Sequence, residues 1–229
     1  RGLELPDNVH VFSSRKAETF RIETRKVALH GRSFKVAATT DNLLPGYPDP
    51  VAGWLNIGVL PTALEGNAEH ARYAPCSVAE LQAKGYQYWA LGHVHEHWVQ
   101  RGDVTIAYPG NLQGRHIREL GVRGALLVSA EDGEITELER LEVDVLRWHM
   151  LDIDVSVVAD MRSAVRMVGL AMEQLLESTP ADLPLAVRVV FKGCSAAHAE
   201  LIVDEGQLRQ EVIAQAVVLD ADRIWVEKV

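Results

Sequence analysis

The sequence has 229 residues, nearly half of them apolar, which is typical of a globular protein with a sizeable core and excludes a disordered chain. No apolar run reaches the length of a membrane helix, and no signal peptide is recognisable. The net charge of −9 argues against a general nucleic-acid coat protein but leaves room for an enzyme that meets DNA through a local patch or a bound metal. The separation of Cys76 and Cys194 favours two buried free thiols in a cytoplasmic protein over a disulfide.

The first part of the chain, residues 1–147, consists mainly of strand patterns. Alternating or continuous apolar residues predict strands at 8–13, 19–34 (a pair), 54–60, 86–92, 104–111, 123–130 and 134–143. A serine N-cap and Gly85 delimit a short helix at 77–85. Residues 131–133, Glu-Asp-Gly, predict a hairpin between the last two strands. Seven carboxylates against one arginine make residues 129–144 the most acidic segment.

The second part, residues 148–229, has the pattern of a compact α+β domain. Helical spacing of apolar residues and an Asp160 N-cap predict a helix at 160–179. Strands are predicted at 148–156, 184–193 and 222–229, and helices at 195–202 and 206–216. The sequence therefore predicts two domains, 1–147 and 148–229.

Three histidines at alternate positions follow the strand at 86–92, in the segment Gly92-His-Val-His-Glu-His97. Alternate residues of an extended chain point to one side, so His93 and His95 face the same way. Neutral imidazole is a common ligand for manganese, iron and zinc, and strand ends of α/β sheets are where active sites lie. The pattern predicts His93 and His95 as metal ligands and His97 as a residue at the rim. Two solvated loop histidines are the alternative.

A longer stretch makes the pattern more specific. Residues 73–97, YAPCSVAELQAKGYQYWALGHVHEH, and 108–128, YPGNLQGRHIRELGVRGALLV, resemble the calcineurin-like metallophosphoesterases, in particular the SbcD-like branch of DNA repair exonucleases. The resemblance implies an α/β fold, part of a four-layer αββα sandwich, followed by a small α+β capping domain. It further implies two metal ions, usually Mn²⁺, that hydrolyse phosphodiesters, and a cytoplasmic nuclease that works on DNA with an SMC-like ATPase subunit.

Carried over position by position, the resemblance assigns His93 and His95 to the metals and Asn111, Arg115 and His116 to substrate binding. Arg115 would contact a phosphate as a charge-assisted donor. A solvated basic turn is the alternative for Arg115.

The sequence departs from this family in two ways. The motifs D-x-H, G-D-x-x-D and G-N-H-D/E, which supply most of the ligands, are absent, and the chain begins at Arg1 without a methionine. This predicts a missing upstream half, which a complementary fragment or a homodimer partner would replace. In addition, Pro61 stands where relatives carry a ligating histidine, and His70 is the nearest histidine in sequence.

We therefore expect this chain by itself to be inactive, although its parent is a metal-dependent exonuclease. Two other interpretations remain open. The chain is a non-catalytic binding or assembly subunit that keeps the fold, as Pro61 favours, or it is part of a phosphatase or small-molecule phosphodiesterase, which the G-H-x-H motif alone does not distinguish.

Overall fold

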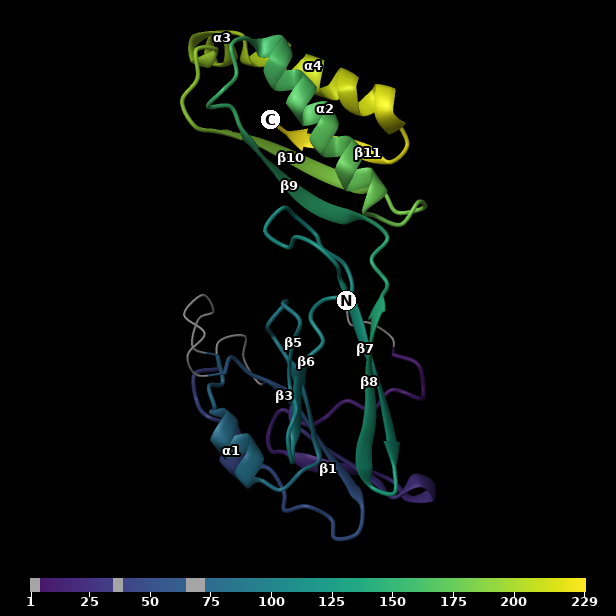
Figure 1. The fold of residues 1–229 in the computed structure, drawn as a ribbon. Coiled ribbons are helices and arrows are strands. Elements are labelled where there is room, and N and C mark those ends of the chain that lie inside the picture. Colours follow the sequence, from purple (N-terminus) through teal and green to yellow (C-terminus); the bar gives the residue numbers. More distant parts are fainter. Residues whose placement is uncertain (1–4, 35–38, 65–72) are drawn as a thin grey trace. The chain divides into compact units, whose positions relative to one another are not determined.

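The structure is a computed structural model that describes residues 5–34, 39–64 and 73–229 (Figure 1). The chain forms two compact units: the first contains the residues up to Asn111 and Gly124–Leu141, and the second contains Leu112–Arg123 and Glu142–Val229. The sequence placed residues 112–123, here called the strap, in the first domain, whereas their contacts group them with the second unit. His70 lies outside the described residues.

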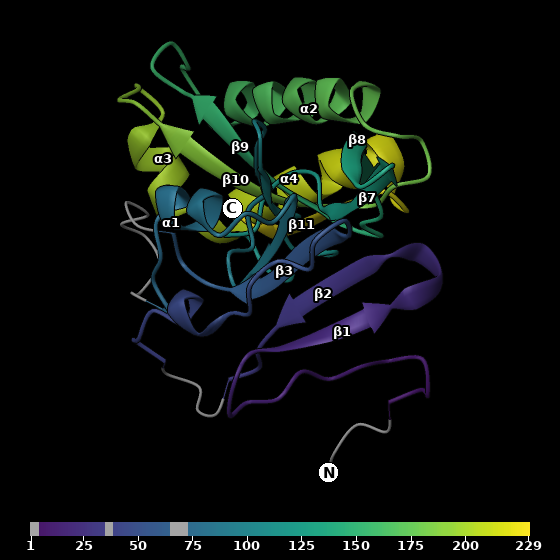
Figure 2. The same ribbon diagram turned by 90° about the horizontal axis from the view of Figure 1, so that it is seen from below.

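A six-stranded sheet forms the centre of the first unit. Its strands, in spatial order, are β1 (Glu18–Ile22), β2 (Val27–Gly31), β3 (Leu55–Pro61), β4 (Tyr88–Gly92), β6 (Thr105–Tyr108) and β5 (Trp98–Gln100). The four central strands pair in parallel, and the two outer strands are antiparallel to their neighbours. Figure 2 shows β1, β2 and β3 side by side at one edge. Parallel pairing brings the carboxyl ends of β3, β4 and β6 to one edge of the sheet.

One face of this sheet packs against helix α1 (Val78–Ala83) and the 3-10 turn η2 (Leu44–Gly46). A capping box starts α1: the Ser77 hydroxyl accepts the Glu80 amide, and the Glu80 carboxylate accepts the Ser77 amide. A second 3-10 turn, η1 (Glu23–Arg25), joins β1 to β2 and ends in left-handed Lys26.

The remaining strands of the first unit are β7 (Gly124–Glu131) and β8 (Glu134–Glu142), which form a two-stranded sheet. Their turn contains Asp132 at φ 52° and Gly133 at φ 86°. Two successive positive φ angles are what a tight hairpin requires, so the hairpin predicted from Glu-Asp-Gly is present.

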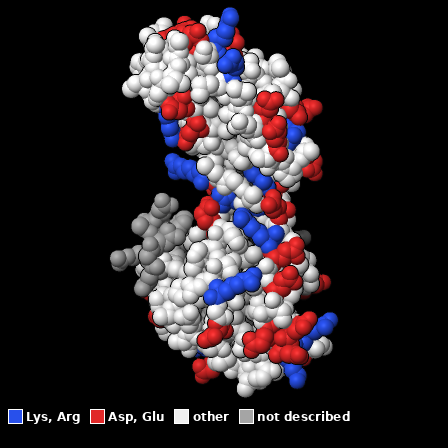
Figure 3. Space-filling model, viewed as in Figure 1, with Lys and Arg blue, Asp and Glu red and all other residues white. Residues whose placement is uncertain are grey.

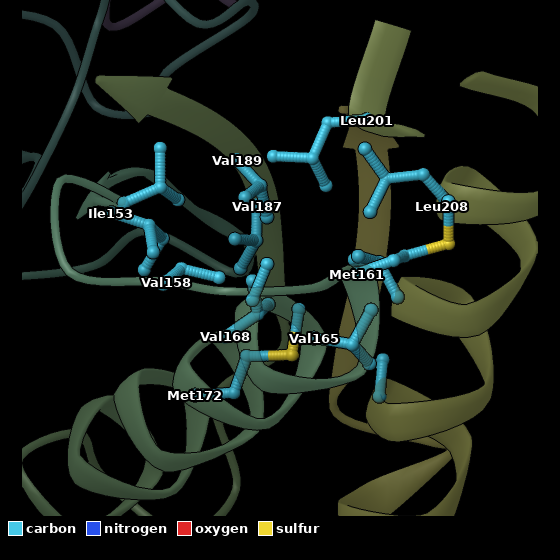
Figure 4. Packing of buried hydrophobic residues seen from close by; sticks show 14 of the residues in the cluster. Ile153, Val158, Met161, Val165, Val168, Met172, Val187, Val189, Leu201 and Leu208 are labelled. Carbon is cyan, nitrogen blue, oxygen red and sulfur yellow. The ribbon is translucent and has the colours of Figure 1, made fainter. Parts of the chain in front are cut away.

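The second unit is a parallel three-stranded sheet with helices on one side (Figure 1). Its elements are β9 (Arg147–Asp154), α2 (Met161–Glu177), β10 (Leu185–Lys192), α3 (His198–Val203), α4 (Glu205–Asp220) and β11 (Ile224–Lys228), and β10 lies between β9 and β11. Met161, Val165, Val168 and Met172 of α2 pack onto β10 as the helical spacing predicted (Figure 4). The side chain of Asp160 accepts the Ser163 amide and caps α2.

Two local predictions are wrong, and one short strand was missed. Residues 8–13 do not form a strand: Val9 and Val11 are exposed, and the Phe12 ring lies over Gly31 instead of pairing with β1 through its backbone. The short strand β5 was not predicted, because three residues carry too little pattern. Both cysteines are free, but Cys194 is exposed rather than buried, since it lies in the turn after β10.

The α/β class predicted from the sequence is confirmed by these mixed elements and multiple sheets. In the described ranges, no helix is both long and apolar enough to cross a membrane. Acidic and basic side chains are interspersed on the face shown in Figure 3.

Candidate metal and phosphate site

The histidine loop, residues 93–97, begins where β4 ends. His93 has a φ of 85°, so the chain bends directly after Gly92 instead of continuing the strand. His93 and His95 are exposed, while Val94 between them is buried in the core of the first unit. Burial of Val94 therefore anchors the loop and leaves both imidazoles on the solvent side.

The ends of the neighbouring strands support this loop. The amide of Thr62, just after β3, donates to the Gly92 carbonyl at 3.2 Å. After β6, the amide of Asn111 donates to the His95 carbonyl at 3.2 Å. Gly110 has a φ of 81°, and a Cβ there would lie 2.9 Å from the His95 carbonyl oxygen, so only glycine permits this approach. The predicted site residue Asn111 thus lies beside the histidine loop.

Aromatic residues that sequence reasoning missed also position the loop. The Tyr73 ring stacks on the His93 imidazole with centroids 4.3 Å apart, and Phe34 contacts Tyr73 edge-on. The Tyr108 hydroxyl donates to the Thr62 carbonyl at 2.8 Å. In the sequence, the position of Tyr108 just before Pro-Gly-Asn was the only signal for such a role.

His97 differs from the other two histidines. Its side chain is half-buried, and its Nδ1 is buried without a hydrogen-bond partner in the described part of the chain. Burial lowers the pKa of His97, as does the positive charge of Arg140, while a hydrogen bond with the Pro109 backbone opposes this shift. The neutral imidazole is therefore the favoured form.

Pro61 is the last residue of β3 and pairs in register with Gly92. A Cβ at Gly92 would lie 3.8 Å from Pro61, so the two strand ends are in close contact next to His93. A proline side chain has no atom that binds a metal, so this position next to the histidine loop offers no ligand.

The described residues provide only part of a metal site. His93 and His95 present two imidazoles, whereas catalytic metal sites usually have at least three protein ligands. In residues 5–34, 39–64 and 73–229, no group of three or more His, Cys, Asp or Glu side chains is arranged to hold a metal ion. The two histidines thus fit a partial ligand set, and a complete metal centre requires further ligands.

The other two predicted site residues, Arg115 and His116, belong to the strap and so to the second unit. Both side chains are exposed. The Arg115 guanidinium donates to the Glu119 carboxylate at 3.2 Å, and the Arg118 amide donates to His116 Nδ1 at 3.3 Å. The structure brings these residues together with each other and with Glu119, a residue that the sequence interpretation overlooked although it stands four positions after Arg115.

Comparison with known proteins identifies the family. Residues 148–229 match the family model described as the middle domain of metallophosphoesterase YhaO. Together with a homologous protein, this match shows that the chain belongs to the metallophosphoesterase family, and its α/β architecture is consistent with their fold.

The homologous protein is the uncharacterized metallophosphoesterase YhaO of Bacillus subtilis (strain 168). It is 35% identical to this chain over 196 residues, which are 83% of this chain and 47% of the relative. The chain thus spans about half the length of the curated relative that it matches.

Proposed function

We propose that this chain is part of a cytoplasmic, metal-dependent phosphoesterase, and that His93 and His95 are two of its metal ligands. The observation that carries the proposal is the histidine loop itself. Two exposed imidazoles are held at the carboxyl edge of parallel strands by buried Val94 and by the hydrogen bond from Asn111 to His95. Because the chain is related to the metallophosphoesterases, we interpret these two imidazoles as metal ligands.

We further propose that the substrate is DNA and that the parent protein is an exonuclease of the SbcD-like branch, assisted by an SMC-like ATPase. The support is the motif from Gly92 to His97 together with Gln-Gly-Arg-His at 113–116. Bound metal ions, for which we propose Mn²⁺, would activate water and stabilise the leaving oxygen. The residues of this chain then have two tasks: His93 and His95 hold the metal, and Arg115 and His116 donate to phosphate oxygens.

Metal titration tests the ligand assignment. We expect weak Mn²⁺ binding to the chain by calorimetry, weakened at least about tenfold in His95→Ala, because loss of even an outer-shell partner costs that much affinity. The exposed His198 of α3 provides the control, since His198→Ala removes an imidazole from the second unit and leaves binding unchanged. Equal Mn²⁺ binding by the unmodified chain and by the double variant His93→Ala/His95→Ala would contradict the assignment.

A second candidate function, a non-catalytic assembly subunit, is favoured by Pro61 at the end of β3. Pro61→His distinguishes the two functions because it returns an imidazole to the strand end beside His93. We expect tighter Mn²⁺ binding in this variant and no Mn²⁺-dependent digestion of linear duplex DNA by the unmodified chain. Digestion by the unmodified chain that His95→Ala abolishes would overturn the expectation of inactivity.

A further inference from the structure

The basic turn, residues 115–119 of the strap, is held firmly on the second unit. The Gln113 side chain bonds the backbone of residues 145–146, with Nε2 donating to one carbonyl at 2.6 Å and Oε1 accepting one amide at 2.8 Å. The indole N–H of Trp148 donates to the Gly114 carbonyl at 3.0 Å. The backbone that carries Arg115 is therefore fixed by bonds to the two residues that precede β9 and to Trp148 within it.

Inside this turn lies a buried carboxylate, Glu119, which is only 4% exposed. Its Oε2 accepts the Arg115 amide at 2.8 Å, and its Oε1 accepts the Arg115 Nη2 at 3.2 Å. The Nε2 of His116 lies 3.9 Å from the same Oε1. A buried carboxylate requires such partners, so its orientation and that of Arg115 depend on each other.

The Arg115 side chain itself remains 65% exposed. A guanidinium is a rigid plane with five N–H donors, and the bond from Nη2 to Glu119 restricts its orientation while most of the side chain stays exposed to solvent. An arginine held in this way loses less side-chain entropy when it binds a phosphate than a free arginine does.

We infer that Glu119 is a positioning residue that orients Arg115 for a phosphate group of the substrate. This inference rests on the proposed function, because it assumes that Arg115 contacts phosphate. The inference predicts a change in anion affinity that is opposite in sign to the change expected from charge alone. Removing a carboxylate beside an anion site strengthens anion binding if only charge matters, but weakens it if the carboxylate orients the donor.

Glu119→Gln separates these two effects. The glutamine oxygen still accepts the Arg115 amide and so preserves the turn, whereas its NH₂ group has no lone pair for the guanidinium. The probe is a short fluorescein-labelled single-stranded oligodeoxynucleotide, and anisotropy measures its affinity for the whole chain over a range of salt concentrations. We expect Glu119→Gln to bind about threefold more weakly, the effect of one oriented hydrogen bond.

Arg115→Ala and the double variant complete a double-mutant cycle with Glu119→Gln. Arg115→Ala weakens binding and reduces the salt slope by about one, as loss of one phosphate contact does. In the Arg115→Ala background, Glu119→Gln causes no further weakening, because no guanidinium is left to orient. Glu173→Gln on α2 is the matched control: it removes the same charge from an exposed position of the second unit and binds no more weakly than the unmodified chain.

The outcomes are distinguishable. Weaker binding by Arg115→Ala together with unchanged or tighter binding by Glu119→Gln overturns the positioning role and leaves the proposed function intact. Unchanged binding by Arg115→Ala overturns both the phosphate contact and the positioning role. NMR of the Arg115 guanidinium provides an independent measurement on the folded proteins. We expect separate side-chain N–H signals in the unmodified chain, where the group is held, and signals averaged by rotation in Glu119→Gln. Separate signals in both proteins would overturn the inference.

Discussion

The cores of the two units are built from different side chains. The buried residues of the second unit's core are all aliphatic apart from two methionines, and its one packed aromatic residue among the described residues, Phe191, is only partly buried. The core of the first unit contains four large aromatic residues whose polar atoms all bond backbone carbonyls: Tyr47 to Val59, Tyr86 to Pro48, Trp89 to Leu81 and Tyr108 to Thr62. Core packing and loop placement are therefore coupled in the first unit, where the histidine loop lies.

The difference has a simple physical origin. An aliphatic side chain stabilises a core in proportion to the apolar area that it buries and does not fix the backbone of a distant loop. A buried tyrosine or tryptophan adds a hydrogen bond whose loss leaves a buried carbonyl without a partner. In this protein the second kind of contact holds the segment after β3 against β6, next to the histidine loop.

Substitution of Trp89 should have the largest effect. Trp89 is fully buried between α1 and the sheet, so Trp89→Ala is expected to cost about 3–5 kcal/mol of stability. Hydrogen exchange should show the loss in the amides of β3, β4 and β6, with β10 unaffected if the two units unfold independently.

Trp225 on β11 serves as the matched control because it is 62% exposed. Trp225→Ala is expected to change stability by less than about 0.5 kcal/mol, as surface substitutions usually do. Equal losses of protection in both units after Trp89→Ala would contradict the separation into two compact units.

Tyr108→Phe tests the coupling between core and loop. It removes a hydroxyl that donates to Thr62 and accepts from the Leu64 amide, and the loss is expected to be about 1–3 kcal/mol because a buried carbonyl and a part-buried amide lose their partner. Tyr88→Phe on β4 is the control, since Tyr88 is also a buried residue and no side-chain hydrogen bond of it is seen in the described residues. Urea unfolding measures both, and equal stabilities of the two variants would refute the coupling.

The smallest expected effect concerns pH. Burial lowers the pKa of His30 from its usual range, while its hydrogen bond to Asn56 opposes the shift. The unfolded chain therefore binds a proton at a higher pH than the folded chain does, so the first unit loses stability as pH falls below about 6.5. Urea unfolding at neutral and mildly acidic pH measures this loss.

The hydrogen bonds around His30 define the tautomer of its neutral ring. Asn56 Oδ1 accepts the Val51 amide, so it also accepts from His30 Nε2, and His30 Nδ1 then accepts from Thr19. A His30→Gln variant should lack this part of the pH dependence, whatever its stability at neutral pH. The same slope in both proteins would exclude His30 as its source.

Much of the secondary structure could be predicted because local patterns specify it. Apolar runs gave the buried parallel strands β3, β4 and β6, and helical spacing with the Asp160 cap gave α2. Residues 8–13 were mispredicted because alternation alone does not tell whether a partner strand is available: Val9 and Val11 alternate, yet the segment contacts Gly31 through the Phe12 ring.

The candidate site could be predicted only in part. Gly92, His93 and His95 are recognisable from the sequence because they follow a buried strand directly. Tyr73 is twenty residues from His93, and nothing in its own neighbourhood indicates that its ring stacks on the imidazole. Glu119 was overlooked because a glutamate in a basic turn is usually solvated, whereas here it is buried.

The sequence by itself determined the α/β class, the order of most elements and the histidines at the end of β4, because each of these depends on residues that are neighbours in the chain. The tertiary structure decided that the strap belongs to the second unit, that Pro61 lies against Gly92 and that Glu119 holds Arg115 from a buried position. These features depend on the burial of particular atoms, and burial is a property of the packed chain rather than of any local pattern.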